Sequence, residues 1–241
     1  MQGPAVGCHW LSLGAPVIAE LAAEAEPDAI VVDMQHGLWT RASLEVAIGL
    51  VAGRAPVLAR TADASDFAIG SCLDAGAHGV IVPMVNSAAE CASVVAAAHY
   101  PPHGRRSGGG VRVGSNFAAY RAACQHIVVA AMIETVEAVE DCEAIAATPG
   151  LDLVFIGPND LSLSMGEAQG SPAFEAVLKR ILAAGKAAGT PVGIYTGGVD
   201  QGLARAAEGY RFVVAASDAG IVRGESRAML SRFKADVGAA S

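Results

Sequence analysis

The 241-residue chain is short of paired cysteines, of basic residues and of long apolar runs, and each shortage excludes a class of protein. Its five cysteines are odd in number and form no C-x-x-C pair, which argues against a disulfide framework or a zinc site. With three lysines and a net charge of −8, it has no basic surface for nucleic acid or anionic membrane.

The apolar and basic residues are also placed unlike those of a membrane or exported protein. No stretch offers the roughly 18 uninterrupted apolar residues of a membrane span. No Lys or Arg precedes Arg41, so the N-terminus lacks the basic region of a signal peptide. We therefore expect no membrane span, free thiols in a reducing compartment, and a cytoplasmic location.

Short apolar, β-branched runs alternate with alanine-rich stretches of helical spacing. Such runs suit strands buried on both faces, and their alternation with helices predicts βαβ units and a parallel sheet. Eight strands in this length, with no linker, predict an α/β fold with a single (β/α)8 TIM barrel over residues 1–241. The expected strands are 5–13, 29–32, 56–59, 79–82, 127–133, 151–156, 191–195 and 211–214. The expected helices are 15–25, 43–51, 66–75, 88–98, 136–147, 173–188, 201–208 and 220–234.

Residues 100–115 (YPPHGRRSGGGVRVGS) form the one long irregular segment, too rich in Gly and Arg for a strand. An ordered loop of this length is usually functional or part of an interface. Arg105, Arg106 and Arg112 could bind a phosphate or carboxylate there, or form salt bridges between subunits.

Polar residues directly after apolar runs are the informative ones, because a (β/α)8 barrel carries its active site at the carboxyl ends of the strands. This rule selects Asp33, His36, Arg60, Glu134 and Asp160. If the fold is a barrel, these five residues converge on one face although they span nearly 130 positions.

Glu134 and Asp160 follow consecutive strands and suit a hard divalent cation such as Mg²⁺ or Mn²⁺. The alternative is that each carboxylate caps or salt-bridges the helix that follows it. The sequence IGPNDL around Asp160 adds a second feature, because Gly157 and Pro158 let the chain approach a ligand. The amides after them open a helix, where an anion is favoured.

His36 could act as a general base near neutral pH, with Asp33 fixing its tautomer and orientation. The alternative is a loop histidine with local hydrogen bonds. Arg60 could stabilise an enolate or hold a carboxylate through its planar fork of donors. The alternative for Arg60 is an ion pair with Asp63 or Asp74.

Several segments together resemble one family, the HpcH/HpaI aldolases, which are metal-dependent (class II) pyruvate aldolases on a TIM barrel of the phosphoenolpyruvate/pyruvate-domain type. The similarity covers most of the chain in the family's order, and IET with FIGPNDLS is highly specific. The matching segments are VVDMQHGLWT (31–40), PVLAR (56–60), LDAGAHGVIVPMVNSAAEC (73–91), YPPHGRRSGGG (100–110), MIETVEAV (132–139) and GLDLVFIGPNDLSLSMG (150–166).

The resemblance implies reversible retro-aldol cleavage of a 4-hydroxy-2-oxo acid, or of a 2-keto-3-deoxy sugar acid, to pyruvate and an aldehyde. It implies Mg²⁺, Mn²⁺ or Co²⁺ and no organic cofactor; with no lysine at a strand end, a Schiff-base mechanism is disfavoured on chemistry alone. It also suggests a hexamer, a trimer of dimers, with the last helix (220–234) packing across a dimer. By position, the implied residues are Glu134 and Asp160 for the metal, His36, Arg60, Asp33 and Asp74 for catalysis, and Arg60, Gly157, Pro158, Asn159 and Met132 for substrate.

Two positions depart from the family pattern. Many members have Glu where this chain has Gln35, and commonly Gln where it has Met132. These departures favour a less hydroxylated aldehyde acceptor. The alternative functions are another metal–enolate lyase reaction on the same barrel, either oxaloacetate decarboxylation or cleavage of a CoA thioester, and a non-catalytic binding module.

Overall fold

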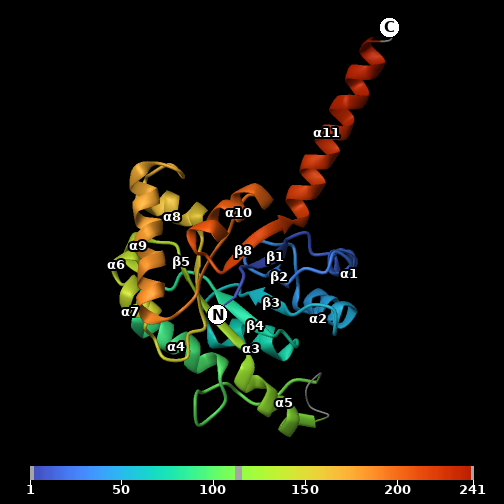
Figure 1. The fold of residues 1–241 in the computed structure, drawn as a ribbon. Helices are drawn as coiled ribbons and strands as arrows, with labels where there is room; N and C mark the ends of the chain where they lie inside the picture. Colours follow the sequence, from blue (N-terminus) through green and yellow to red (C-terminus); the bar gives the residue numbers. More distant parts are fainter. Residues whose placement is uncertain (1–2, 112–115, 240–241) are drawn as a thin grey trace.

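A computed structural model describes residues 3–111 and 116–239. Its eight strands are parallel, pair in chain order and close into a barrel in which β1 is hydrogen-bonded to β8 (Figure 1). The predicted (β/α)8 barrel is confirmed. The strands are β1 (Val6–Leu11), β2 (Ala29–Asp33), β3 (Val57–Arg60), β4 (Gly79–Val82), β5 (Val128–Ile133), β6 (Leu153–Ile156), β7 (Val192–Ile194) and β8 (Phe212–Ser217).

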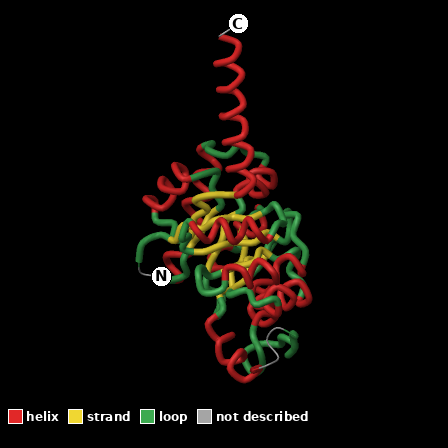
Figure 2. Tube along the Cα trace, turned by 90° about the vertical axis from the view of Figure 1, so that its right-hand side faces the viewer, coloured by secondary structure: helices red, strands yellow, loops and turns green. Residues whose placement is uncertain are grey.

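Helices surround the strands, as the view turned by 90° shows (Figure 2). The first half of the barrel carries α1 (Pro16–Glu24), α2 (Arg41–Val51), α3 (Asp66–Asp74), α4 (Ala88–Ala98), α5 (Phe117–Ala123) and the 3₁₀ helix η2 (Cys124–His126). The second half carries α6 (Val136–Glu140), α7 (Cys142–Ala146), α8 (Pro158–Met165), α9 (Pro172–Ala188), α10 (Val199–Glu208) and α11 (Asp218–Ala239). No helix of the described residues is long and apolar enough to cross a membrane.

The strands divide their side chains between two cores. In β2 every residue is buried; Ala29 and Val31 pack inside the barrel, whereas Ile30 and Val32 pack against the helices. Successive strand residues point to opposite faces, so Asp33 continues the inward series at the carboxyl end of β2. Asp33 pairs in register with Arg60 of β3. The sheet therefore delivers these two polar side chains as neighbours to one end of the barrel.

Two segments differ from the sequence-based expectation. The single helix expected over 136–147 is broken into α6 and α7 at Asp141, whose Oδ2 accepts a hydrogen bond from the backbone N–H of Ala88, 2.7 Å away. The loop expected over 100–115 leads into α5, which was not predicted. Residues 112–115, including Arg112, lie outside the described residues.

The last helix leaves the body of the molecule. α11 begins at β8 and projects away from the barrel in both views (Figures 1 and 2), and it is longer than the helix predicted over 220–234. Large apolar side chains along it are exposed, among them Val222, Met229, Phe233 and Val237. From Gly220 to Val237 every residue of α11 is exposed, so among the described residues no helix covers the side of the barrel between α10 and α1.

Candidate active site

A pocket of about 80 Å³ opens at the carboxyl ends of the strands. A larger hollow of about 810 Å³ lies elsewhere, beside α9 and β7, but the polar strand-end residues converge on the smaller pocket. It gathers most of the predicted site residues into one place, together with three aromatic residues that were not predicted. It is lined by Trp10, His36, Arg60, Met132, Glu134, Phe155, Gly157, Pro158, Asn159, Asp160 and Tyr195.

Arg60 is held by a buried ion pair with Asp33. Its Nε donates to Asp33 Oδ1 at 2.8 Å and its Nη2 donates to Oδ2 at 2.6 Å, and both side chains are nearly buried. The expected alternative partners, Asp63 and Asp74, are therefore wrong, because strand register places Asp33 opposite Arg60. Burial acts to raise the pKa of the Asp33 carboxyl, but the Arg60 hydrogen bonds and charge outweigh it and hold that pKa below its ordinary value.

Asp33 reaches the His36 segment through the backbone. Its Oδ1 accepts the backbone N–H groups of Gln35 and His36, at 3.0 and 3.1 Å. The expectation that Asp33 orients the imidazole directly is not met, because both carboxylate oxygens accept hydrogen bonds from these amides, from Arg60 and from Trp10. Asp33 shapes the turn that carries His36, whose side chain is exposed at the pocket.

Glu134 lines the pocket, and its two carboxylate oxygens differ in their contacts. Oε1 accepts the backbone N–H of Met84 at 2.7 Å, and Met84 adopts a left-handed backbone (φ 58°) to donate it. Oε2 is buried and has no hydrogen-bond partner among the described residues. Burial, reinforced by the nearby Asp160 charge, raises the pKa of Glu134 to about 7, although Met84 and Arg60 act in the opposite direction.

The turn between β6 and α8 supplies the part of the pocket wall next to Glu134. Gly157, Pro158 and Asn159 line it, and Asp160 stands in the first turn of α8. A Cβ on Gly157 would lie 2.3 Å from Glu134 Oε2 and 2.9 Å from Met132 Cε, so any larger residue here would displace the ends of these two side chains. Asn159 Oδ1 accepts a hydrogen bond from Gln169 Nε2 at 2.7 Å, which fixes the orientation of its amide.

The expectation that the two carboxylates serve only to cap helices is not met. Thr135, not Glu134, caps α6, and Gly157 is the N-cap residue of α8, with Asp160 inside the first turn. The described residues contain no group of three or more His, Cys, Asp or Glu side chains suited to a metal. Two carboxylates fit a hard divalent ion that keeps water or substrate oxygens in its other positions, and the buried, unpartnered Glu134 Oε2 is the observation that favours such an ion.

Asp74 does not join this pocket. It ends α3, where its Oδ1 accepts a hydrogen bond from Arg106 Nη2 at 2.6 Å, and it lines a different hollow with Arg105. Arg105 in turn pairs with Asp66. Within the single chain these two arginines pair with Asp66 and Asp74, and the salt bridge between subunits stays a prediction. Asp74 stays a residue implied by resemblance alone.

Three pocket residues escaped the sequence analysis: Trp10, Phe155 and Tyr195. They lie at inward positions of β1, at β6 and just after β7, and they pack on one another, with Trp10 in contact with both of the others. The sequence analysis selected polar residues that directly follow apolar runs, so it did not select these aromatic residues. The signal available was their scarcity, since the chain has only two tryptophans.

The closed barrel and the carboxylate pocket at its carboxyl end define a (β/α)8 enzyme. The chain belongs to the HpcH/HpaI aldolase/citrate lyase family, whose model matches residues 7–223. This finding confirms the resemblance noted in the sequence.

Curated and solved relatives agree with this placement. The chain is 38% identical over 237 residues to a hydroxypyruvate/pyruvate aldolase of Rhizorhabdus wittichii, covering 94% of this chain and 93% of the relative. It is 36% identical to a 4-hydroxy-2-oxovalerate aldolase of Novosphingobium aromaticivorans, covering 78% and 76%. The crystal structure of a family protein from Burkholderia cenocepacia matches with a TM-score of 0.90 at 29% identity, covering 97% and 96%.

Proposed function

We propose that this chain is a class II pyruvate aldolase, one catalytic domain over residues 1–241 that reversibly cleaves a 4-hydroxy-2-oxo acid to pyruvate and an aldehyde. The observation that carries the proposal is the small pocket that Arg60, His36, Glu134 and Asp160 line together, with Glu134 Oε2 buried and without a hydrogen-bond partner. Relatives at 36–38% identity that are named as aldolases of this type support it.

Arg60, the amides that open α8 and the two carboxylates have separate roles in the reaction. Arg60 donates hydrogen bonds from Nε and Nη2 to Asp33. Its Nη1 is left for the C2 oxygen of the substrate, where negative charge develops. The amides that open α8 near Asn159 suit the pyruvate carboxylate. A divalent cation (Mg²⁺, Mn²⁺ or Co²⁺) held by Glu134 and Asp160 would act as a Lewis acid toward the keto oxygen.

His36 is the remaining group, and it accepts the proton that the cleavage releases. In the cleavage direction His36 accepts the proton of the C4 hydroxyl and the C3–C4 bond breaks. The aldehyde leaves, and the electron pair passes to the enolate of pyruvate, which is then protonated at C3. The chain's three lysines lie on α9 and α11, away from the pocket, so the residues support this route without a Schiff base or organic cofactor.

Pyruvate release tests the proposal. We expect the purified protein to release pyruvate from 4-hydroxy-2-oxovalerate, measured by coupling to lactate dehydrogenase and NADH. The release should stop with EDTA and return with Mg²⁺ or Mn²⁺, because two carboxylates alone offer no Lewis acid. Turnover that EDTA does not affect would contradict the metal-dependent mechanism. Oxaloacetate, assayed in parallel, measures the decarboxylase alternative.

The other alternative of the sequence analysis, a CoA-thioester lyase, depended on Arg105, Arg106 and Arg112, of which Arg112 lies outside the described residues. Arg105 donates to Asp66 and Ser93, and Arg106 donates to Asp74 and Tyr120. A phosphorylated ligand would have to compete with Asp66 and Asp74 for these two arginines. We also propose a reducing, cytoplasmic setting, which is supported by five buried free thiols.

We propose further that the protein is a homo-oligomer, a hexamer built as a trimer of dimers, in which α11 packs on a second copy. Met229, Phe233 and Val237 recur at intervals of four and share one exposed stripe of the helix with Val222, seven residues before. Exposed apolar residues on α1 and α10 flank the side of the barrel that lacks a helix, namely Val17, Leu21, Val199 and Leu203. Exposed apolar surface of this extent is typical of an interface.

Breaking the α11 stripe should reduce the oligomer. Phe233→Glu places a charge on the exposed apolar stripe, so we expect light scattering to report a smaller multiple of 24.3 kDa than for the unmodified chain. Ser231→Glu, on the opposite face of the same helix, is the matched control and should leave the mass unchanged. An unmodified protein that elutes as a monomer would contradict the assembly.

A further inference from the structure

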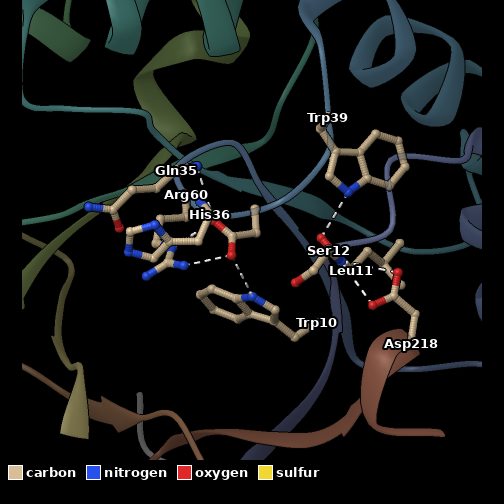
Figure 3. A network of polar contacts seen from close by, with 9 residues as sticks. Trp10, Leu11, Ser12, Gln35, His36, Trp39, Arg60 and Asp218 are labelled. Atoms are coloured by element: carbon tan, nitrogen blue, oxygen red, sulfur yellow. Dashed lines mark hydrogen bonds and ion pairs between the residues drawn. The ribbon is translucent and has the colours of Figure 1, made fainter. Parts of the chain in front are cut away.

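Trp10 contacts the Arg60–Asp33 pair in two ways. The Arg60 guanidinium lies over the indole ring, 5.1 Å from its centroid, and the indole Nε1 donates to Asp33 Oδ2 at 3.3 Å. The ring is 1% exposed and lines the pocket on the inward side of β1. Figure 3 shows Trp10 beside Arg60 and His36. One aromatic side chain thus touches both members of the buried pair.

The ring is itself held rigidly. It stacks on Phe155 of β6 with centroids 5.7 Å apart and meets the edge of Tyr195, after β7, at 5.3 Å. Offset and edge-to-face contacts of this kind fix the plane of an aromatic ring. Trp10 therefore connects the far wall of the barrel to Arg60.

We propose that Trp10 is a positioning residue that fixes the plane of the Arg60 guanidinium, so that Nη1 faces the developing enolate. The Asp33 carboxylate fixes two nitrogens within the plane of the fork, but two hydrogen bonds along one edge restrain a tilt about that edge less firmly than they restrain motion within the plane. The indole face blocks that tilt from one side. This inference rests on the proposed aldolase function.

If the Trp10 ring orients Arg60, replacing it should lower kcat more than it weakens substrate binding. Charge on the C2 oxygen appears in the transition state, so a tilted guanidinium lowers kcat with little change in KM. A cation–π contact is stronger in a desolvated site than at an exposed one. We therefore expect Trp10→Phe, which loses the indole N–H and part of the ring face, to lower kcat about tenfold.

The chain offers a matched control in its second tryptophan. Trp39 is also buried, and its indole N–H also has a partner, the Leu11 carbonyl oxygen at 2.9 Å. Trp39 does not line the pocket, and Figure 3 shows it on the other side of the network. Trp39→Phe should therefore leave kcat within about twofold of the unmodified enzyme while suffering the same kind of substitution.

A double-mutant cycle distinguishes positioning from general damage. Arg60→Lys keeps a charge but loses the planar fork, so the plane that Trp10 fixes no longer exists. Trp10→Phe should then lower kcat about tenfold in the unmodified enzyme and less than about twofold in Arg60→Lys. Equal effects in the two backgrounds, or no effect in the unmodified enzyme, would overturn the proposal. If Trp10→Phe does not fold, Trp10→Tyr enters the same cycle.

Binding of oxalate, a planar dianion shaped like the pyruvate enolate, repeats the cycle without turnover. Measured by calorimetry with Mg²⁺ present, its affinity should fall about tenfold in Trp10→Phe and less than twofold when Arg60 is already lysine. If no 4-hydroxy-2-oxo acid is cleaved but the oxalate cycle is non-additive, the proposed substrate fails and the role of Trp10 stands. If pyruvate is released and both cycles are additive, the role of Trp10 fails and the aldolase stands.

Discussion

Gly157→Ala should lower aldolase activity about 100-fold or more while the barrel still folds. The added Cβ would lie 2.3 Å from Glu134 Oε2, closer than any real contact, so the carboxylate must move. The backbone of Gly157 has a φ of −94°, which alanine adopts readily, so the substitution acts through the new atom rather than through backbone strain. Displacing a reacting group by about 1 Å costs on the order of 100-fold in rate.

The affinity for Mn²⁺, measured by calorimetry on the metal-stripped protein, should fall together with the rate. Gly70→Ala is the control, because a Cβ there meets nothing within 4 Å and alanine suits the helix α3. It should keep both the rate and the metal affinity of the unmodified protein. A Gly157→Ala protein that binds Mn²⁺ normally would remove Glu134 Oε2 from the ligand set.

The barrel and one wall of its pocket were predictable because they depend on local patterns. Buried parallel strands are apolar on both faces, so the first polar residue after each run marks the strand end. Asp33, Arg60 and Glu134 were found in this way, and the closed sheet then brings them together. Asp160 required one further step, since it follows the turn that opens α8.

The partners of these residues were not predictable, because they depend on register between strands and on loops far away in sequence. The pairing of Arg60 with Asp33 follows from the alignment of β2 on β3, which no single strand specifies. The hydrogen bond from the Met84 amide to Glu134 joins residues 50 positions apart and needs a left-handed backbone at a non-glycine residue. Neither the Arg60–Asp33 pair nor the Met84–Glu134 hydrogen bond can be read from patterns along the chain.

Side chains that act through packing were missed for a different reason. Trp10 lies on β1, the least regular of the predicted strands, where pairing with β8 shifts register between Cys8 and His9. A tryptophan on a strand is ordinarily a core residue, and its role here appears only once Arg60 and Asp33 are seen against it. Asp74 differs from Trp10 in the opposite sense. The family resemblance assigns Asp74 a catalytic role, but in the single chain it forms an ion pair with Arg106.

Glu134→Gln should lower metal affinity and activity but raise the stability of the metal-free protein. The amide retains an oxygen for the Met84 N–H but removes the charge at the Oε2 position, so metal affinity and aldolase activity should fall by at least about 100-fold. The metal-free variant should nevertheless be more stable than the metal-free unmodified protein at pH 8. An interaction that costs stability in the empty site and is required for activity is characteristic of a functional group.

The direction of the stability change follows from the pKa. Burial raises the pKa of Glu134 from 4.5 to about 7, so the folded protein binds this proton more tightly than the unfolded chain does. Ionisation of Glu134 therefore destabilises the fold progressively between pH 4.5 and 7, and fully above pH 7, by at most about 3 kcal/mol. Urea unfolding in EDTA should show Glu134→Gln gaining stability over the unmodified protein across this range, with no difference below pH 4.5.

The exposed Glu137→Gln, three residues further on in α6, is the control and should alter neither the pH dependence of unfolding nor the metal affinity. A Glu134→Gln protein that is less stable than the unmodified chain in EDTA at pH 8 would mean that the carboxylate is satisfied within the fold. In that case the unpartnered Oε2 would no longer argue for a cation. Gained stability together with lost Mn²⁺ binding is the combination that only a ligand held ready for a metal produces.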